Sequence, residues 1–151
     1  MNLQEELKAL LERIAELEEQ VKEEQEFPQQ NDKYWYININ GDVTSGKWEK
    51  FDIQEDMLEI GDVFETKEQA KFAVEKLKVE AELRKFSRPF KEDEYNYFIQ
   101  IHPSHNNIVV ESDDFYQTQG TIYFESTTIA NEAIDAIGEN RIKKYIFGVE
   151  D

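Results

Sequence analysis

The sequence predicts an α+β protein, with an N-terminal coiled-coil helix followed by a domain of two similar β-hairpin–strand–helix units with an antiparallel sheet. Apolar residues recur at heptad spacing near the start, aromatic strand-like segments alternate with amphipathic helical ones, and the second half repeats the pattern of the first. We expect the coiled-coil helix over residues 1–26, a linker over 27–33 and the α+β domain over 34–151, with its repeat at about 34–88 and 95–147.

The first segment has the apolar spacing of a coiled coil. Its heptad residues are Leu3, Leu7, Leu10, Ile14, Leu17 and Val21. Leucine fills the d positions and two of the three a positions are β-branched, which favours a parallel dimer in which Arg13 can pair with Glu18 between strands. Leu11 at an e position widens the stripe and leaves a higher oligomer open. Self-association is the leading interpretation, beside docking on the chain's own domain or binding another protein.

The first half of the domain begins after a polar linker that contains Pro28, which ends the helix. Aromatic and β-branched residues predict a strand over 34–39. Asn40-Gly41 suits a tight hairpin turn, so a return strand is expected over 42–48. The acidic stretch 49–62 is interpreted as a loop or a short helical turn.

A longer helix follows in this half. Thr66 is a suitable N-cap, and Gln69 three residues later completes a capping-box pattern. We expect this helix to run from Lys67 to about Phe86, with Pro89 beyond its end.

The second half has a similar order of elements. Three strands are expected, over 95–101, 108–110 and 120–124. Ser126 or Thr127 is the expected N-cap of a helix that stops near Gly138. A last short helix, capped by Asn140, is expected over 141–147.

An internal repeat underlies this parallel. Val63-Phe64-Glu65-Thr66 corresponds to Tyr123-Phe124-Glu125-Ser126, and each segment is followed by alanine and branched aliphatic residues at matching positions. We therefore expect two related units that share one core, with helices on one side of the sheet.

Composition narrows the classes of function. The formal net charge of −17 disfavours direct contact with nucleic acid or anionic membranes and favours basic protein partners. Without cysteine the chain has no disulfide and no thiolate chemistry. No apolar run approaches the length of a membrane span, and the first residues do not resemble a signal peptide, so we expect a cytoplasmic protein.

The sequence contains no recognisable catalytic motif, so we do not expect an enzyme. His102 and His105 form a loose motif, which we interpret as a solvated turn, and we expect no metal and no cofactor. The sequence lacks a supported nucleophile and a glycine-rich phosphate loop, and adjacent carboxylates such as Asp113 and Asp114 are common in any acidic protein. Tyr36 and Tyr97 are assigned to structural roles rather than to base stacking.

The acidic residues between positions 49 and 68 recur every three or four positions, interrupted by only Lys50 and Lys67. Carboxylates along an edge can imitate DNA phosphates, so these residues form the predicted partner-binding surface, whereas the plain alternative is a solvated acidic face. The predicted surface consists of Glu49, Asp52, Glu55, Asp56, Glu59, Asp62 and Glu65.

Three segments resemble small proteins encoded by tailed phages and prophages of Gram-positive bacteria. They are the strand Tyr34-Trp35-Tyr36-Ile37 with its Asn40-Gly41 turn, the helix that starts at Thr66-Lys67-Glu68-Gln69-Ala70, and the tail from Arg141 to Glu150. The resemblance implies phage origin but no catalytic residues. Acidic phage accessory proteins are similar in character to inhibitors of host defence, including anti-CRISPR and anti-restriction proteins.

The leading hypothesis is a phage accessory protein that inhibits a basic host nucleic-acid-handling protein, such as a CRISPR or restriction nuclease, through its acidic surface. Two alternatives from other classes are an oligomeric assembly or scaffold protein that uses the N-terminal helix, and a binder that sequesters a small ligand.

Overall fold

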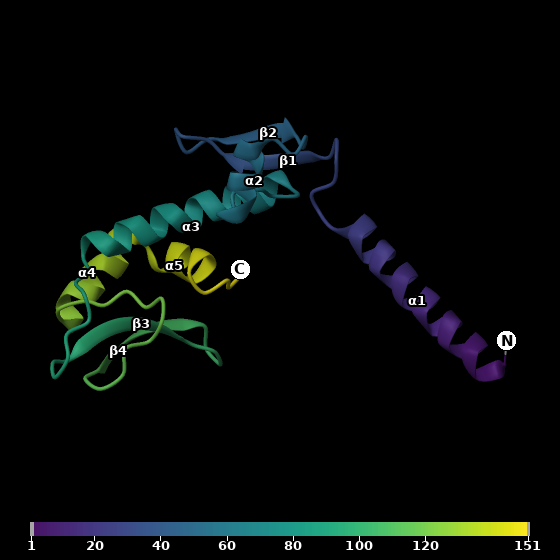
Figure 1. The fold of residues 1–151 in the computed structure, drawn as a ribbon. Coiled ribbons are helices and arrows are strands. Elements are labelled where there is room, and N and C mark those ends of the chain that lie inside the picture. The colour runs from purple at the N-terminus through teal and green to yellow at the C-terminus, as the bar shows by residue number, and fades with distance from the viewer. Residues whose placement is uncertain (1, 151) are drawn as a thin grey trace. The chain divides into compact units, whose positions relative to one another are not determined.

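The structure is a computed structural model that describes residues 2–150, apart from the side chain of Gln25 (Figure 1). It is an α+β fold, as the sequence predicts. The elements in chain order are α1 (Leu3–Gln25), β1 (Lys33–Ile37), β2 (Val43–Lys47), α2 (Asp52–Glu59), α3 (Lys67–Lys85), β3 (Asn96–His102), β4 (Asn107–Asp113), α4 (Thr127–Ile137) and α5 (Glu139–Tyr145). The chain divides into two compact units, residues 1–70 (unit 1) and 71–151 (unit 2), with the boundary inside α3.

The long N-terminal helix is confirmed. Asn2 is its N-cap: the Oδ1 atom of Asn2 accepts a hydrogen bond from the backbone N–H of Glu5 at 2.9 Å, and the Glu5 carboxylate accepts one from the backbone N–H of Asn2 at 3.3 Å. This reciprocal pair satisfies N–H groups that have no partner within a helix. After the last turn, the Gln29 side chain donates to the carbonyls of Glu23 and Glu26.

Unit 1 is built around the antiparallel hairpin of β1 and β2. The Asn38 side chain organises the turn, because its Oδ1 atom accepts from the backbone N–H groups of Asn40 and Asp42 at 3.0 Å. Tyr34 and Trp48 are buried and pack edge to face, with ring centroids 5.5 Å apart. Gly46 lies against the Tyr34 ring so closely that an added Cβ would be 3.0 Å from it, which explains a glycine in the middle of a strand.

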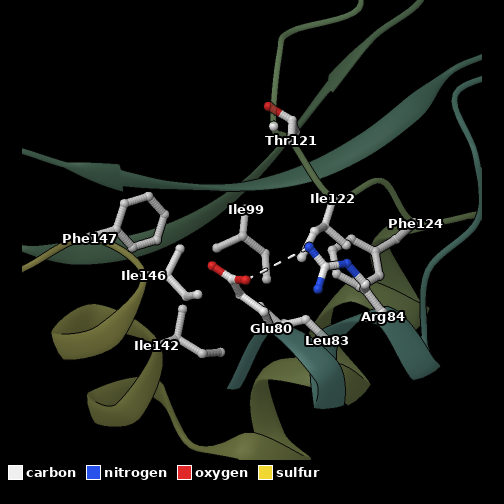
Figure 2. A pocket seen from close by; sticks show the side chains of 11 residues that line it. Glu80, Leu83, Arg84, Ile99, Thr121, Ile122, Phe124, Ile142, Ile146 and Phe147 are labelled. Carbon is white, nitrogen blue, oxygen red and sulfur yellow. Dashed lines mark ion pairs between the residues drawn. The ribbon is translucent and has the colours of Figure 1, made fainter. Parts of the chain in front are cut away.

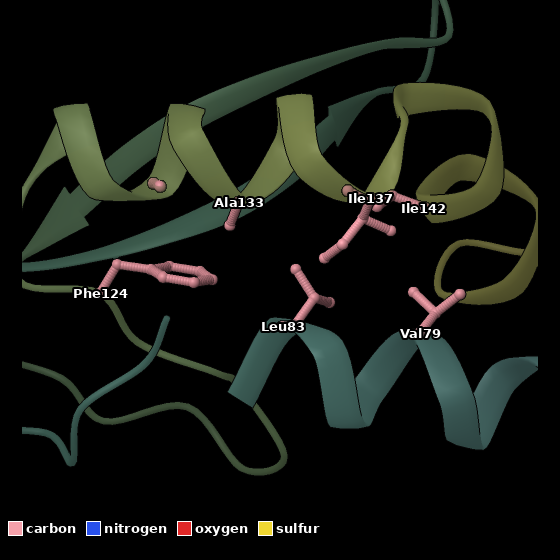
Figure 3. Packing of buried hydrophobic residues seen from close by; sticks show 7 residues of the cluster. Val79, Leu83, Phe124, Ala133, Ile137 and Ile142 are labelled. Carbon is pink, nitrogen blue, oxygen red and sulfur yellow. The ribbon is translucent and has the colours of Figure 1, made fainter. Parts of the chain in front are cut away.

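Unit 2 contains the antiparallel hairpin of β3 and β4 and a buried apolar cluster. Figure 3 shows side chains of α3, α4 and α5 converging with that of Phe124. The buried members of the cluster are Val79, Leu83, Phe124, Ala130, Ala133, Ile137 and Ile142.

The two halves share a specific backbone arrangement. In unit 1 Trp35 and Phe64 exchange two backbone hydrogen bonds of 2.8 Å, and in unit 2 Tyr97 and Phe124 do so at 3.2 and 2.7 Å. Two residues after each bridge stands a hydroxyl N-cap: Thr66 Oγ1 accepts from Gln69 at 3.1 Å, and Ser126 Oγ accepts from Ile129 at 3.1 Å.

Several details differ from the sequence-based expectation. The strands form two separate two-stranded sheets rather than one antiparallel sheet. The strand expected over 120–124 is reduced to isolated bridges at Tyr123 and Phe124, and Phe64 in the first half likewise forms only an isolated bridge. The stretch 49–62 contains a true helix, α2. The last helix begins at Glu139, directly after Gly138, rather than at Arg141 with Asn140 as its N-cap, because the positive φ of 102° at Gly138 turns the chain at once from α4 into α5.

Within the described residues no helix combines the length and the apolar character needed to cross a membrane.

Candidate interaction surface

A buried glutamine positions the short helix α2 in unit 1. The Gln54 side chain is 7% exposed. Its Oε1 atom accepts hydrogen bonds from the backbone N–H groups of Glu49 and Phe51 at 2.9 and 3.3 Å. Its Nε2 atom donates to the Tyr34 hydroxyl at 3.1 Å and to the Lys47 carbonyl at 2.9 Å. These four bonds join α2 to the hairpin and determine which side of the helix faces the protein.

The opposite side of α2 carries a row of carboxylates. Asp52, Glu55, Asp56 and Glu59 are spaced i, i+3, i+4 and i+7, so they share one helical face. All four are exposed. Within residues 2–150 none of them takes part in a salt bridge. We call these four residues the acidic face.

The other predicted surface residues have different positions. Glu49 and Glu65 are exposed but lie outside α2, and their backbone N–H groups donate to Gln54 and Gln69. Asp62 is half-buried, and its carboxylate accepts a 2.7 Å hydrogen bond from the backbone N–H of Ile37. The structure therefore brings four of the seven residues together, whereas the carboxylate of Asp62 is bound within the fold.

Exposed apolar side chains border the acidic face. Ile53 and Ile60 are 69% and 80% exposed, and Phe51 and Leu58 are 56% and 39% exposed. Each pair is seven residues apart, so at 100° per residue one pair follows each flank of the carboxylate row. This apolar border was not identified from the sequence. The signal that could have revealed it is the seven-residue spacing of the two apolar pairs on either side of the carboxylates. A partner would meet charge in the centre and apolar surface at both edges.

Asp62 gives a test of the local electrostatics. Burial raises the pKa of its carboxyl above the ordinary value, and the hydrogen bond from Ile37 opposes this in part. Because the native state then holds the proton more tightly than the unfolded chain, stability falls as pH rises from about 4 through the raised pKa and is lower at neutral pH. We expect Asp62→Asn, whose carbonyl can still accept from Ile37, to be more stable than the wild type at pH 7 but not at pH 3.

The gain in Asp62→Asn should stay below about 1 kcal/mol, because the group is partly solvated. Asp62→Ala should instead lose about 1 kcal/mol, because the N–H of Ile37 loses its acceptor. Urea denaturation at the two pH values measures both effects. An Asn variant that is less stable than the wild type at pH 7 would show that the ionised carboxylate is favoured in the fold.

The second predicted surface is the apolar stripe of α1. Every heptad residue is exposed, from 43% for Leu17 to 83% for Leu3, and Leu11 is 58% exposed. Arg13 forms a 3.2 Å salt bridge with Glu16 on the outside of the same helix. A helix that is solvated on all sides has mainly polar residues, so six exposed aliphatic side chains at heptad spacing indicate an interaction surface.

Unit 2 contains a partly open cavity of about 190 Å³ (Figure 2). Its walls are mainly apolar, and Glu80 and Arg84 form a 3.8 Å ion pair among the lining residues. The apolar lining consists of Leu83, Ile99, Ile122, Phe124, Ile142, Ile146 and Phe147. This cavity was also not expected from the sequence, and it is the natural site for the alternative of a small ligand.

The two histidines and the aromatic residues of the strands contact other side chains of the fold. The rings of His102 and His105 stack with centroids 4.8 Å apart, and the described residues contain no group of three or more His, Asp or Glu side chains placed to hold a metal. Tyr97 packs against the core of unit 2. Trp35 is half-buried, and the ammonium groups of Lys33 and Lys67 lie 4.8 and 5.5 Å from its ring centroid.

No family model matches the chain, and no significant match was found among curated proteins or solved structures.

Proposed function

We propose that this chain is a non-catalytic inhibitor that binds a basic nucleic-acid-handling protein through the acidic face of α2. The observation that carries the proposal is the row of four exposed carboxylates without salt-bridge partners in the described structure, held outward by the buried Gln54. The net charge of −17 adds long-range attraction to a basic surface.

The row has the dimensions of a short stretch of nucleic-acid backbone. Residues i and i+7 of a helix are about 10 Å apart along its axis, which is about three phosphate steps of one DNA strand. A groove whose lysine and arginine side chains are arranged for phosphates can therefore meet several of these carboxylates together. The apolar flanks supply contact area that phosphates lack, which would strengthen binding to a protein groove.

The resemblance to phage-encoded proteins directs the proposal to a particular kind of target. A phage protein of this character would act on a host defence protein, with a CRISPR or restriction nuclease as the leading class. Such a target has a basic groove for DNA, and occupying that groove prevents cleavage without any catalysis by the inhibitor.

The test begins with a target captured from a lysate of a Gram-positive host at low and at high salt. The purified target is then bound to duplex DNA, and the concentration of this protein that displaces the DNA is measured. The variant of interest replaces the acidic face with amides: Asp52→Asn, Glu55→Gln, Asp56→Asn and Glu59→Gln. We expect it to need at least about tenfold more protein than the wild type.

A matched control removes the same four negative charges from exposed positions of unit 2: Glu111→Gln, Asp114→Asn, Glu132→Gln and Asp135→Asn. It should displace DNA like the wild type. Equal losses in both variants would mean that net charge alone matters, and no loss in either would refute the acidic face. A small molecule retained by the purified protein, with no captured protein, would favour ligand binding in the cavity of unit 2.

A further inference from the structure

We infer that α1 associates with α1 of a second copy of this chain as a parallel, in-register, two-stranded coiled coil. This inference goes beyond the proposed inhibition and does not depend on it. It starts from the exposed heptad stripe: the a residues are Leu7, Ile14 and Val21, and the d residues are Leu3, Leu10 and Leu17. β-branched a residues combined with leucine at d favour two parallel strands.

The apolar stripe alone fits either orientation of the second helix. In a parallel pair each heptad residue meets its own counterpart. In an antiparallel pair Leu3 would lie beside Val21, Leu7 beside Leu17 and Leu10 beside Ile14, so all six residues would again be covered. The choice between orientations must therefore come from the residues that flank the stripe.

The flanking charges favour the parallel orientation. Arg13 is a g residue and Glu18 is the following e residue, so a parallel pair places each Arg13 opposite Glu18 of the second copy, twice per dimer. The antiparallel pair would place Arg13 against Arg13 of the second copy. One orientation gains two attractions and the other gains a repulsion.

Most of the remaining glutamates lie away from the stripe; the exception is Glu24, at the d position after Leu17 in the last turn of the helix. Glu5, Glu12 and Glu19 occupy the f positions, on the far side of the helix. Glu6 is the one acidic g residue, and in a parallel pair it neighbours Leu11 of the second copy, where its methylene groups can cover an apolar side chain. Two such helices can approach although each is strongly acidic.

Disulfide formation between engineered cysteines can report the relative orientation of the two α1 helices, because the chain has no cysteine of its own. We expect Leu3→Cys alone and Val21→Cys alone each to form a disulfide-linked dimer on oxidation. A mixture of the two, with one carrying a size tag, should give no mixed dimer, since the thiols would be about 27 Å apart along a parallel pair. Ala9→Cys, at a c position outside the stripe, is the control and should remain uncrosslinked.

A charge exchange provides a second test with the apolar stripe intact. Arg13→Glu should raise the dimer dissociation constant about tenfold by placing Glu opposite Glu18, and adding Glu18→Arg should restore it. Sedimentation of the full chain measures both. A monomeric wild type, or crosslinking found mainly in the mixed sample, would overturn the inference; a monomer would assign the stripe to the chain's own domain or to another protein.

Discussion

Replacing Asn96 by leucine is expected to lower the free energy of unfolding of unit 2 by about 3–5 kcal/mol. Asn96 is fully buried at the start of β3. Its Oδ1 atom accepts from the Arg88 guanidinium and from the backbone N–H of Lys91, both at 2.8 Å. Its Nδ2 atom donates to the carbonyls of Lys91, Glu94 and Asp113 at 2.9, 2.8 and 3.2 Å.

The leucine variant has a similar size but would remove the acceptor of the Lys91 N–H and the donor to three carbonyls in a part-buried region, whereas the Arg88 guanidinium would keep its bond to the Pro89 carbonyl. The loss of several partners at once is the costly case for a buried hydrogen bond. Urea denaturation followed by circular dichroism measures the loss. Asn131→Leu, at an exposed position of α4, is the control and should change stability by less than about 0.5 kcal/mol. A loss below about 1 kcal/mol in Asn96→Leu would mean that the loop before β3 rearranges and recovers its hydrogen bonds.

Replacing Gln54 by leucine is expected to cost unit 1 about 2–4 kcal/mol and to loosen α2. The variant removes the one acceptor of the Glu49 and Phe51 N–H groups and both hydrogen bonds that the side chain donates to the hairpin. Gln54→Glu separates these contributions, because a carboxylate can still accept from Glu49 and Phe51 but cannot donate to Tyr34 or Lys47. Hydrogen exchange of the α2 amides, alongside urea denaturation, distinguishes local loosening from global loss.

Glu55→Gln on the solvent side of the same helix is the control and should leave both measurements unchanged within about 0.5 kcal/mol. If the acidic face binds a partner, Gln54→Leu should also weaken that binding although all four carboxylates remain. Unchanged exchange of the α2 amides in Gln54→Leu would show that the helix is held by other contacts, and its partner binding should then also be unchanged.

Local signals in the sequence predicted the parts of the fold that depend on neighbouring residues. Thr66 with Gln69, and Ser126, act as N-caps because a hydroxyl three residues before a helical N–H is in reach whatever the rest of the chain does. The heptads of α1 predicted its helix because residues three and four positions apart lie on one face of a helix. The repeat was visible in the residues around Phe64 and Phe124, which form equivalent backbone bridges.

The parts that sequence reasoning missed depend on residues distant along the chain. Gln54 reaches Tyr34, twenty positions away, and Asn96 reaches Asp113, seventeen positions away. Nothing local marks an amide for burial, because amides are usually exposed. Without Gln54, α2 looks like an acidic stretch with scattered apolar residues, and the four carboxylates that share its outward face cannot be separated from the other three predicted ones. The cavity of unit 2 likewise arises from packing among four separate segments.

The side-chain amides of Gln54 and Asn96 have the same structural role in their two units. Gln54 in unit 1 and Asn96 in unit 2 are the only polar residues of the described chain that are buried to this extent. Each one receives N–H groups from a loop and donates to a carbonyl at the end of a hairpin strand. In small units with limited apolar cores, such a side chain fixes a loop that the hydrophobic effect alone would not specify.

Both tryptophans of the chain, Trp35 and Trp48, belong to unit 1, and Trp48 is 1% exposed against the ring of Tyr34. Indole fluorescence therefore follows the unfolding of unit 1 alone, in the natural sequence and without any label. Unit 2 contributes only tyrosine and phenylalanine to the emission. Coincident fluorescence and ellipticity transitions would indicate that the units unfold together, and separated transitions would give each unit its own stability in one titration.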